Sequence, residues 1–208
     1  MEGRIYGFKP SIIDGSERIF EGDEKVELPE RYSYRAYLPE VLDQGSESIC
    51  VPCTVSAYLN WKENLKNGIT KDNKIALYEI YNAKTNNGDG MSYKDAFSYL
   101  KKKGVKSKSG KLKINSYGKI NSTLALKYAI VMNGPCCGAL PVYSEYEDFW
   151  IKRPGDRLLG GHAISIIGYD EEGFFIRNSW GDDFGDEGYT YIKNEEMDAM
   201  MEIWTIID

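Results

Sequence analysis

The sequence of 208 residues contains one histidine, His162, and only four cysteines. A single histidine excludes metal sites built from several imidazoles, and any catalysis that needs an imidazole must use His162. Four cysteines are too few for a disulfide-dense secreted scaffold. No apolar run approaches the ~18 residues that a membrane-spanning helix requires. With 42% hydrophobic and 28% charged residues, the composition predicts one folded domain, or two lobes sharing a cleft.

The charge of the chain is uneven. The formal net charge of −6 argues against a nucleic-acid partner, and we expect neither a nucleic-acid nor a membrane partner. Residues 101–119 nevertheless hold eight lysines and no acidic residue. They are interpreted as a solvated basic loop or, alternatively, as a patch for an acidic partner. The start, Met1-Glu2-Gly3-Arg4, lacks the apolar core of a signal peptide, so we expect a cytoplasmic or other intracellular location, in a bacterial or phage source.

The pattern of apolar residues changes along the chain. The first half predicts helices over residues 50–67, from Ser92 to about Gly104, and between Ser122 and Asn133. The second half predicts short strands over residues 138–143, 162–168, 174–178, 189–192 and 203–207. Helices followed by strands indicate an α+β fold with segregated lobes. We expect a polar appendage over residues 1–28, a helical lobe over about 44–134 and an antiparallel β lobe over about 135–208, with a site between the lobes.

Cys50 falls in the first turn of a predicted helix, where unpaired N–H groups and the helix dipole favour a thiolate. A thiolate attacks carbonyl carbons, so this position suits a nucleophile. A buried structural cysteine is the simpler interpretation of the position alone. The sequence Cys50-Val51-Pro52-Cys53 also matches the C-x-x-C pattern of thiol–disulfide oxidoreductases. A zinc site with Cys136 and Cys137 is disfavoured, because adjacent residues of a strand point to opposite faces. No metal or cofactor is expected.

His162 opens an apolar strand, and Asn178 follows sixteen residues later. Two antiparallel strands joined by an acidic turn over residues 170–173 would bring these two side chains together. The asparagine carbonyl oxygen could then accept a hydrogen bond from one ring nitrogen and direct the other toward a thiol. Trp180 could shield that hydrogen bond from water, although a plain core aromatic is the alternative.

Three separated segments together resemble the papain-like cysteine peptidases, over roughly residues 29–208. They are Asp43-Gln44-Gly45-Ser46 with Cys50 six residues after the glutamine; Gly161-His162-Ala163 through Gly168-Tyr169; and Arg177-Asn178-Ser179-Trp180-Gly181 with the glycine-rich segment 184–189. The resemblance implies a two-lobe fold with a helical lobe, an antiparallel sheet or barrel, and the active site in the cleft.

The resemblance also implies roles for individual residues. Cys50 would be the nucleophile, paired with His162 as thiolate and imidazolium, and Asn178 would orient the histidine. The side chain of Gln44 and the backbone N–H of Cys50 would form the oxyanion hole. Substrate would be a polypeptide. The residues implied in holding it are Gly90 by backbone pairing, Met91, Ala139 and Ala163 in a pocket for the second residue before the scissile bond, and Trp180 on the leaving-group side.

The sequence departs from that family around Cys50. Glu47 stands where the family has a half-cystine, so the usual disulfide near the site cannot form, and Val51 replaces a tryptophan. We expect no propeptide of the usual length before the domain, and residues 1–28 could cover the cleft or pack on the back of the protein. The leading hypothesis is a cysteine endopeptidase. A catalytically silent binding or structural module and a Cys50/Cys53 oxidoreductase are the alternatives, and acyl transfer to an amine would use the same residues as hydrolysis.

Overall fold

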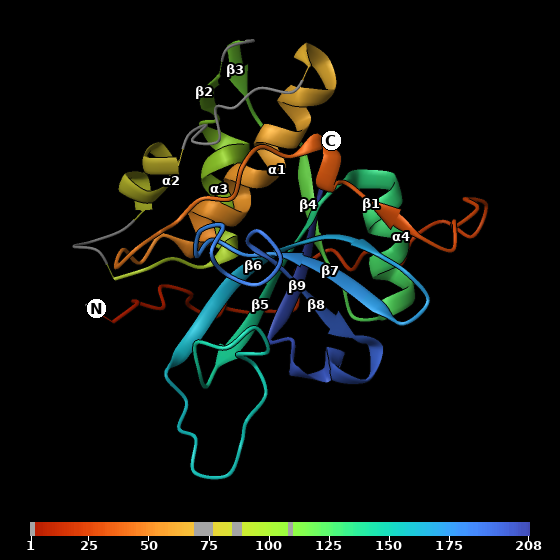
Figure 1. The fold of residues 1–208 in the computed structure, drawn as a ribbon. Coiled ribbons are helices and arrows are strands. Elements are labelled where there is room, and N and C mark those ends of the chain that lie inside the picture. Colours follow the sequence, from red (N-terminus) through yellow and green to blue (C-terminus); the bar gives the residue numbers. More distant parts are fainter. Residues whose placement is uncertain (1–2, 69–76, 85–88, 108–109) are drawn as a thin grey trace.

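The helices of the first half lie above a seven-stranded antiparallel sheet (Figure 1). The computed structural model describes residues 3–68, 77–84, 89–107 and 110–208. Its α-helices are α1 (Cys50–Asn67), α2 (Leu77–Lys84), α3 (Tyr93–Lys102) and α4 (Thr123–Asn133). The sheet runs in the order β4 (Ser116–Lys119), β9 (Glu202–Ile207), β5 (Cys136–Val142), β6 (Gly160–Tyr169), β7 (Gly173–Arg177) and β8 (Tyr189–Lys193), with β1 (Tyr32–Ser33) beside β6. The strands β2 (Val105–Ser107) and β3 (Gly110–Leu112) form a separate hairpin, and Arg35–Tyr37 and Asn194–Ala199 are short 3₁₀ helices. The α+β class is confirmed.

The predicted helices form for the local reasons that their sequences indicate. Helix α1 begins at Cys50 and tolerates Pro52, because the first turn has no intrahelical use for that missing N–H. In α3 the Ser92 hydroxyl accepts from the N–H of Asp95 at 3.2 Å. In α4 the Ser122 hydroxyl accepts from the N–H of Ala125 at 3.1 Å. Side-chain caps therefore fix the beginnings of two helices, and all three predicted helices are present.

The sheet contains the five predicted strands and two more. Strands β1 and β4 come from earlier in the chain than residue 135, so the sheet is not built from the second half alone. The basic stretch 101–119 contributes the end of α3, the β2–β3 hairpin and β4 rather than one solvated loop. The division of the chain into lobes remains a prediction.

One large apolar core joins the helices to the sheet. Helix α1 packs along β6, and the rings of Phe97, Tyr117 and Trp204 lie within 6.1 Å of one another between α3 and the sheet. The buried Tyr93 hydroxyl donates to the carbonyl of Gly138 at 2.6 Å and so ties α3 to β5. This packing fixes the first turn of α1 against β6. In the described part of the chain, no helix has the length and apolarity needed to cross a membrane.

The segment before Leu28, which the sequence predicts to be a polar appendage, is attached to the core and the sheet at several points. Phe8 is buried in the core, and the Ser11 hydroxyl donates to the buried Glu202 carboxylate at 3.0 Å. Further along, the N–H of Phe20 donates to the carbonyl of Lys119 at 2.9 Å, which places the segment beside β4. In Figure 1 the segment runs, dark red, from the end marked N to the sheet. Isolated contacts of single side chains and of the backbone hold it, and such contacts leave no periodic pattern in a sequence.

Candidate active site

The four predicted catalytic residues come from three parts of the fold that meet at the beginning of α1. Cys50 is the first residue of that helix, His162 is the third residue of β6, and Asn178 directly follows β7. Gln44 lies in the loop before α1, where its N–H donates to the carbonyl of Ser179 at 2.9 Å. Hydrogen bonding of that loop to the segment after β7 therefore brings Gln44 to the same place as the other three.

His162 and Asn178 are hydrogen-bonded, as the antiparallel strands predict. His162 Nε2 lies 2.7 Å from Asn178 Oδ1, and because an amide oxygen only accepts, Nε2 carries the proton. Asn178 Oδ1 also accepts from the N–H of Ser179 at 2.7 Å, which fixes the amide. The second ring nitrogen, Nδ1, is buried and has no hydrogen-bond partner in the described part of the chain. Nδ1 is therefore the nitrogen left for a reacting group.

Aromatic rings cover this pair. The Trp180 ring lies 4.6 Å from the imidazole at an interplanar angle of 31°, and the side chain is buried. Phe149 packs against both, at 5.7 Å from the imidazole and 4.9 Å from the indole. A hydrogen bond excluded from water holds its geometry more strongly, so the shielding expected of Trp180 is present. The contribution of Phe149 had no sequence signal beyond its being an aromatic residue in a long loop.

Cys50 is fully buried beside the strand that carries His162. Burial raises the pKa of its thiol to about 11, while the backbone amides of Ala163 and Gly7 act in the opposite direction. Burial also lowers the pKa of His162 to about 4, against the hydrogen bond with Asn178. Both groups are therefore neutral at pH 7 in this structure. Burial therefore opposes the thiolate–imidazolium pair that the resemblance implies.

Gln44 is oriented by a residue that sequence reasoning assigned no role. The Ser179 hydroxyl donates to Gln44 Oε1 at 2.7 Å. The amide nitrogen, Nε2, is thereby turned to the other side and donates to the carbonyls of Ile5 and Glu47, at 3.2 and 3.0 Å. Since the Ile5 carbonyl already takes a hydrogen bond from Nε2, the donor predicted for the oxyanion hole is in use.

That carbonyl belongs to residues 4–9, which we call the N-terminal strap. The strap runs across the predicted substrate-binding residues. The N–H of Met91 donates to the carbonyl of Gly7 at 2.8 Å, and the N–H of Lys9 donates to the carbonyl of Met91 at 3.0 Å. The N–H of Phe8 donates to the carbonyl of Gly161 at 3.3 Å. The strap therefore pairs with the backbone of Met91 and lies against Gly90, the residue to which the resemblance assigns backbone pairing with substrate.

The pocket predicted for substrate lies under the strap. Met91, Ala139 and Ala163 are all buried, and Ala139 faces Ala163 across the β5–β6 pair. Phe8 packs beside them, because a Cβ on Gly161 would meet its ring at 2.7 Å and the Tyr93 ring lies 5.7 Å away. Of the two outcomes left open for the N-terminal residues, covering the cleft is the one observed for the strap.

The strap runs in the direction opposite to that expected for a substrate. Its first residue, Arg4, lies on Trp180, which the resemblance places on the leaving-group side. Phe8 then forms a parallel bridge with Met91, on the side of the pocket for residues before the scissile bond. A substrate would pass these two places in the reverse order. The backbone N–H of Gly7 lies near enough to the Cys50 sulfur to lower the pKa of that thiol.

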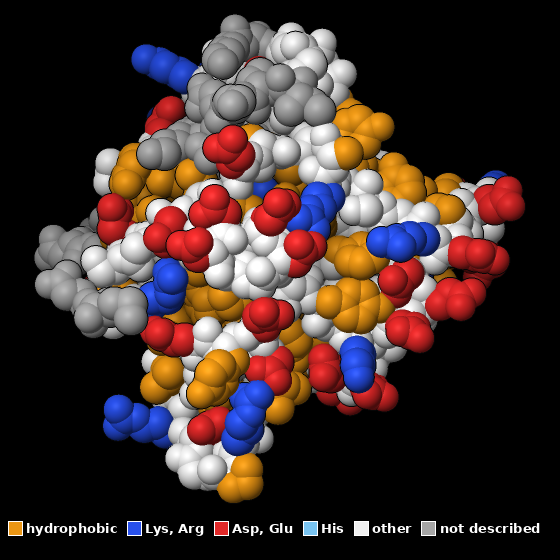
Figure 2. All heavy atoms as spheres, viewed as in Figure 1, with side chains coloured by type: hydrophobic (Ala, Val, Ile, Leu, Met, Phe, Trp, Pro, Cys, Tyr) orange, Lys and Arg blue, Asp and Glu red, His pale blue; other side chains and the backbone are white. Residues whose placement is uncertain are grey.

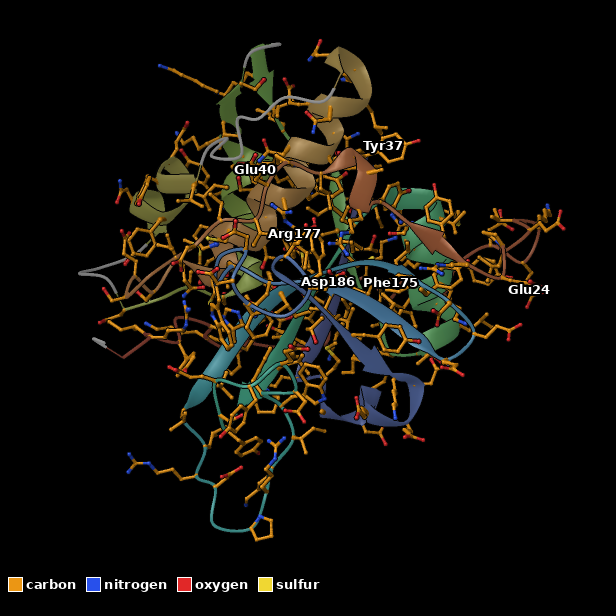
Figure 3. All side chains as sticks on the ribbon, viewed as in Figure 1. Glu24, Tyr37, Glu40, Phe175, Arg177 and Asp186 are labelled. Atoms are coloured by element: carbon orange, nitrogen blue, oxygen red, sulfur yellow. The ribbon has the colours of Figure 1, made fainter. Side chains whose placement is uncertain are left out.

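Arg177 is a second residue whose contribution the sequence did not reveal. Its buried guanidinium donates to the carbonyls of Pro39 and Glu40, both at 2.7 Å, and to the Tyr189 hydroxyl at 2.8 Å. Figure 3 shows Arg177 and Glu40 near each other at the centre of the view. These bonds tie the residue before Asn178 to the loop that leads to Gln44. Arg177 belongs to the segment 177–181 that resembles the family. Two of its three acceptors are backbone carbonyls, which a sequence does not reveal.

The other three cysteines have no role in the proposed chemistry, although Cys53 lines a small pocket with Asn178 and Ser179. All four thiols are free and buried. Cys53 packs with Ile49 and Leu77 in a small separate apolar cluster, and Cys136 and Cys137 lie in β5. Within the described ranges, no three His, Cys, Asp or Glu side chains are grouped as metal ligands.

A hollow of about 620 Å³ lies elsewhere, over β7 and β8. Its lining includes Arg31, Phe175, Asp186 and Tyr191, of which Phe175 and Asp186 are labelled in Figure 3. None of the predicted catalytic residues lines it. The candidate site is therefore the strap-covered cleft and not this hollow.

The buried imidazole gives a testable pH dependence. An unfolded chain takes up a proton on His162 near pH 6.5, whereas in the folded protein its pKa is about 4. The unfolded state therefore binds more protons between these values, so the free energy of unfolding falls as the pH falls from 6.5 toward 4, by up to about 3 kcal/mol. Urea unfolding at pH 7 and pH 4.5 measures this loss. The loss is expected to shrink in His162→Asn, and an equal loss in both proteins contradicts the assignment.

The chain is similar in sequence to known proteins. A sequence model described as "Papain family cysteine protease" matches residues 40–205. The chain is 34% identical over 82 residues to cathepsin B-like cysteine proteinase 3 of Ostertagia ostertagi and 38% identical over 73 residues to cathepsin B-like CP3 of Giardia intestinalis. These matches cover 36% and 31% of this chain, and 47% and 24% of the relatives, so the chain matches less than half the length of either.

Solved structures share the fold over nearly the whole chain. Xylellain, a cysteine protease from Xylella fastidiosa, superposes with a TM-score of 0.81 at 22% identity, covering 97% of this chain and 95% of that one. Procathepsin B S9 from Trypanosoma congolense superposes with a TM-score of 0.78 at 16% identity, covering 97% and 86%. The family match spans the loop of Gln44, the helix of Cys50 and the strands of His162 and Asn178, so the chain belongs to the papain family of cysteine proteases.

Proposed function

We propose that the protein is a cysteine endopeptidase that hydrolyses polypeptides with Cys50, His162 and Asn178. The observation that carries this proposal is the 2.7 Å hydrogen bond between His162 and Asn178, which leaves the Nδ1 atom of His162 without a partner in the described part of the chain. The next residue of the strand, Ala163, has its backbone amide near the Cys50 sulfur. A nucleophile, a base and a group that orients the base are the three components of nucleophilic catalysis on a carbonyl. A purely structural histidine would not need a buried, unpartnered Nδ1, which is costly to maintain.

Acylation of the enzyme follows from these positions. The Cys50 sulfur transfers its proton to His162 Nδ1 and attacks the carbonyl carbon of the scissile bond. The carbonyl electron pair moves onto oxygen, and Gln44 Nε2 and the Cys50 N–H donate to that oxyanion. As the intermediate collapses, the C–N bond breaks and the imidazolium delivers its proton to the leaving amine. The thioester and the free amine result.

Deacylation uses the same groups in the reverse roles. Nδ1 takes a proton from water, and the hydroxide oxygen attacks the thioester carbonyl. The C–S bond then breaks with its electron pair on sulfur, the carboxylic acid is released, and the imidazolium returns its proton to the sulfur to regenerate the thiol. Asn178 holds the imidazole in one orientation throughout, because its fixed side-chain oxygen accepts the proton of Nε2. An amine in place of water would lead to acyl transfer by the same path.

In the described conformation the strap inhibits this chemistry in cis. It buries Cys50, accepts a hydrogen bond from Gln44 through Ile5 and presents an N–H to the nucleophile. Its reversed direction also keeps its own peptide bonds from being attacked. We therefore propose that the strap leaves the cleft before substrate enters, and that Cys50 and His162 form their ion pair when water reaches them.

Labelling with an electrophilic epoxide, followed by peptide mapping, tests the function. We expect modification at Cys50, with loss of labelling in His162→Ala, together with cleavage of a mixed pool of internally quenched peptides. A folded wild-type protein that neither labels nor cleaves would be a silent binding module. Catalysed disulfide reduction that survives His162→Ala would assign Cys50 and Cys53 to an oxidoreductase instead.

The orientation of Gln44 gives a second prediction. Gln44→Ala removes one donor from the oxyanion hole and is expected to lower kcat by about 10²–10³-fold. Ser179→Ala leaves the donor in place but lets the amide rotate, so its loss of kcat should be clearly smaller while KM changes little. Peptide hydrolysis measures both. Ser179→Thr, which keeps the hydroxyl, is the control, and a fall in kcat for Ser179→Thr equal to that for Ser179→Ala contradicts the proposed role.

A further inference from the structure

The side chain of Arg4 binds on the leaving-group side of the cleft, at a position formed by Asp43 and Trp180 that we call the seat. Its guanidinium carbon is 5.2 Å from the centre of the Trp180 ring. Nη1 donates to the Asp43 carboxylate at 3.2 Å, and Nη2 donates to the Trp180 carbonyl at 3.4 Å. The seat therefore combines an aromatic face, a carboxylate and a carbonyl, all of which attract a cation.

The seat is formed by the body of the protein and not by the strap. Asp43 forms an antiparallel bridge with Trp180, and the N–H of Gly181 donates to the carbonyl of Leu42 at 3.1 Å. Asp43 Oδ1 also accepts from the N–H of Gly45 at 2.9 Å, which fixes the carboxylate. When the strap leaves, these bonds remain, and the carboxylate and the ring stay in position for another cation.

The seat lies close to the reacting atoms. Ile5, the residue after Arg4, places its carbonyl on Gln44 Nε2, the predicted oxyanion donor. The charge of Arg4 also acts on His162, where it adds to the lowering of the imidazole pKa that burial causes. A side chain in this seat is therefore within about two residues of the bond that Cys50 would attack.

Acidic residues continue from the seat along the leaving-group side. A neighbouring hollow is lined by Glu145, Glu147, Asp148 and Asp183 and by Phe184, and it has no basic residue in its lining. The Phe184 ring lies 5.1 Å from that of Trp180, so the hollow adjoins the seat. Figure 2 shows acidic side chains spread across the face it presents, in keeping with the net charge of −6. Their field favours cationic chains over anionic ones.

We propose that this seat is a specificity subsite that selects arginine or lysine at the first or second residue after the scissile bond. The strap then holds Arg4 where a basic substrate residue would lie. This inference rests on the proposed peptidase function and names its substrate class: polypeptides with a basic residue just after the cleavage point. Asp43 and Trp180 are its specificity-determining residues.

The expected preference for a basic residue follows from its two contacts, with the Trp180 ring and with the Asp43 carboxylate. A partly exposed cation–π contact and a partly exposed ion pair each contribute modestly, and together they correspond to a preference of about tenfold in kcat/KM. Asp43 is 57% exposed at its side chain, so added salt should reduce the preference.

Internally quenched peptides that differ at one position test the proposal. Each carries arginine, citrulline or glutamate at the first or second residue after the bond, and citrulline keeps the shape of arginine without its charge. The full chain carrying Arg4→Ala is used, because this variant vacates the seat. We expect kcat/KM to rank arginine above citrulline above glutamate, and Asp43→Asn to lower the arginine-to-citrulline ratio about threefold.

Asp43→Asn keeps an oxygen for the Gly45 N–H, so the loop geometry is retained. Glu24→Gln is the matched control, since it removes the same charge at an exposed site on the opposite side of the view from the N-terminus (Figures 1 and 3). The ratio should not change in Glu24→Gln. Equal kcat/KM for the arginine and citrulline peptides would overturn this inference alone. Absence of cleavage of every peptide by wild type, Arg4→Ala and Gly7→Ala would overturn the proposed function.

Discussion

Cys50→Ala is expected to lower kcat/KM for peptide hydrolysis by about 10⁴-fold or more, because no other group can form the covalent intermediate. The nearest alternative thiol, Cys53, lies one helical turn further on and packs with Ile49 and Leu77. Burial and the neighbouring Cys50 both raise the pKa of Cys53. The Cys53 sulfur is therefore out of reach of a substrate, and its thiol stays protonated at neutral pH.

Kinetics on one quenched peptide substrate measure this effect, with His162→Ala and the double variant beside it. The effects of substituting residues that act as a unit are not additive. The kcat/KM of the double variant should therefore be close to that of Cys50→Ala. Cys136→Ala is the matched control, because it removes another buried thiol, in β5, that the mechanism does not use. Activity in Cys50→Ala within tenfold of wild type would remove Cys50 from the role of nucleophile.

Much of the site could be predicted from the sequence because its geometry follows from local rules. The helix beginning at Cys50 is marked by proline in its first turn and glycine at its end. The pairing of His162 with Asn178 follows from two strands joined by a short acidic turn, and the register of β6 and β7 places them together. Where the spacing of residues along the chain determines their positions, the sequence is sufficient to predict the site.

The rest could not be predicted, because backbone atoms and long-range packing produce it. The strap is held by carbonyl and N–H groups of Gly7, Lys9 and Met91, and these groups are the same in every residue. The acceptors of Arg177 and the partner of the Ser179 hydroxyl are likewise invisible before the fold is known. The effect of burial on the site also escapes the sequence: the resemblance implies an ion pair, whereas burial raises the pKa of Cys50 and lowers the pKa of His162.

Gly7→Ala is expected to raise the activity of the full chain by about 10- to 100-fold. A Cβ on Gly7 would lie 2.3 Å from the carbonyl oxygen of Ser48, which is backbone next to the first turn of α1 and cannot move aside. The strap must shift instead, and forced overpacking of this kind costs about 1–3 kcal/mol, which weakens closure by the corresponding factor. The substitution adds one methyl group to the strap and changes no residue of the proposed catalytic machinery.

The rate of epoxide labelling at Cys50 and the hydrolysis of a quenched peptide should rise together in this variant, because both require an open cleft. Gly3→Ala is the matched control: it makes the same change one residue before the strap, where a Cβ would meet no atom within 4 Å. Its activity should equal that of wild type. If Gly7→Ala labelled and cleaved no faster than Gly3→Ala, closure of the cleft by the strap would not limit activity. Cys50 would then have to be exposed by a movement of the two predicted lobes in which the strap stays attached to one lobe.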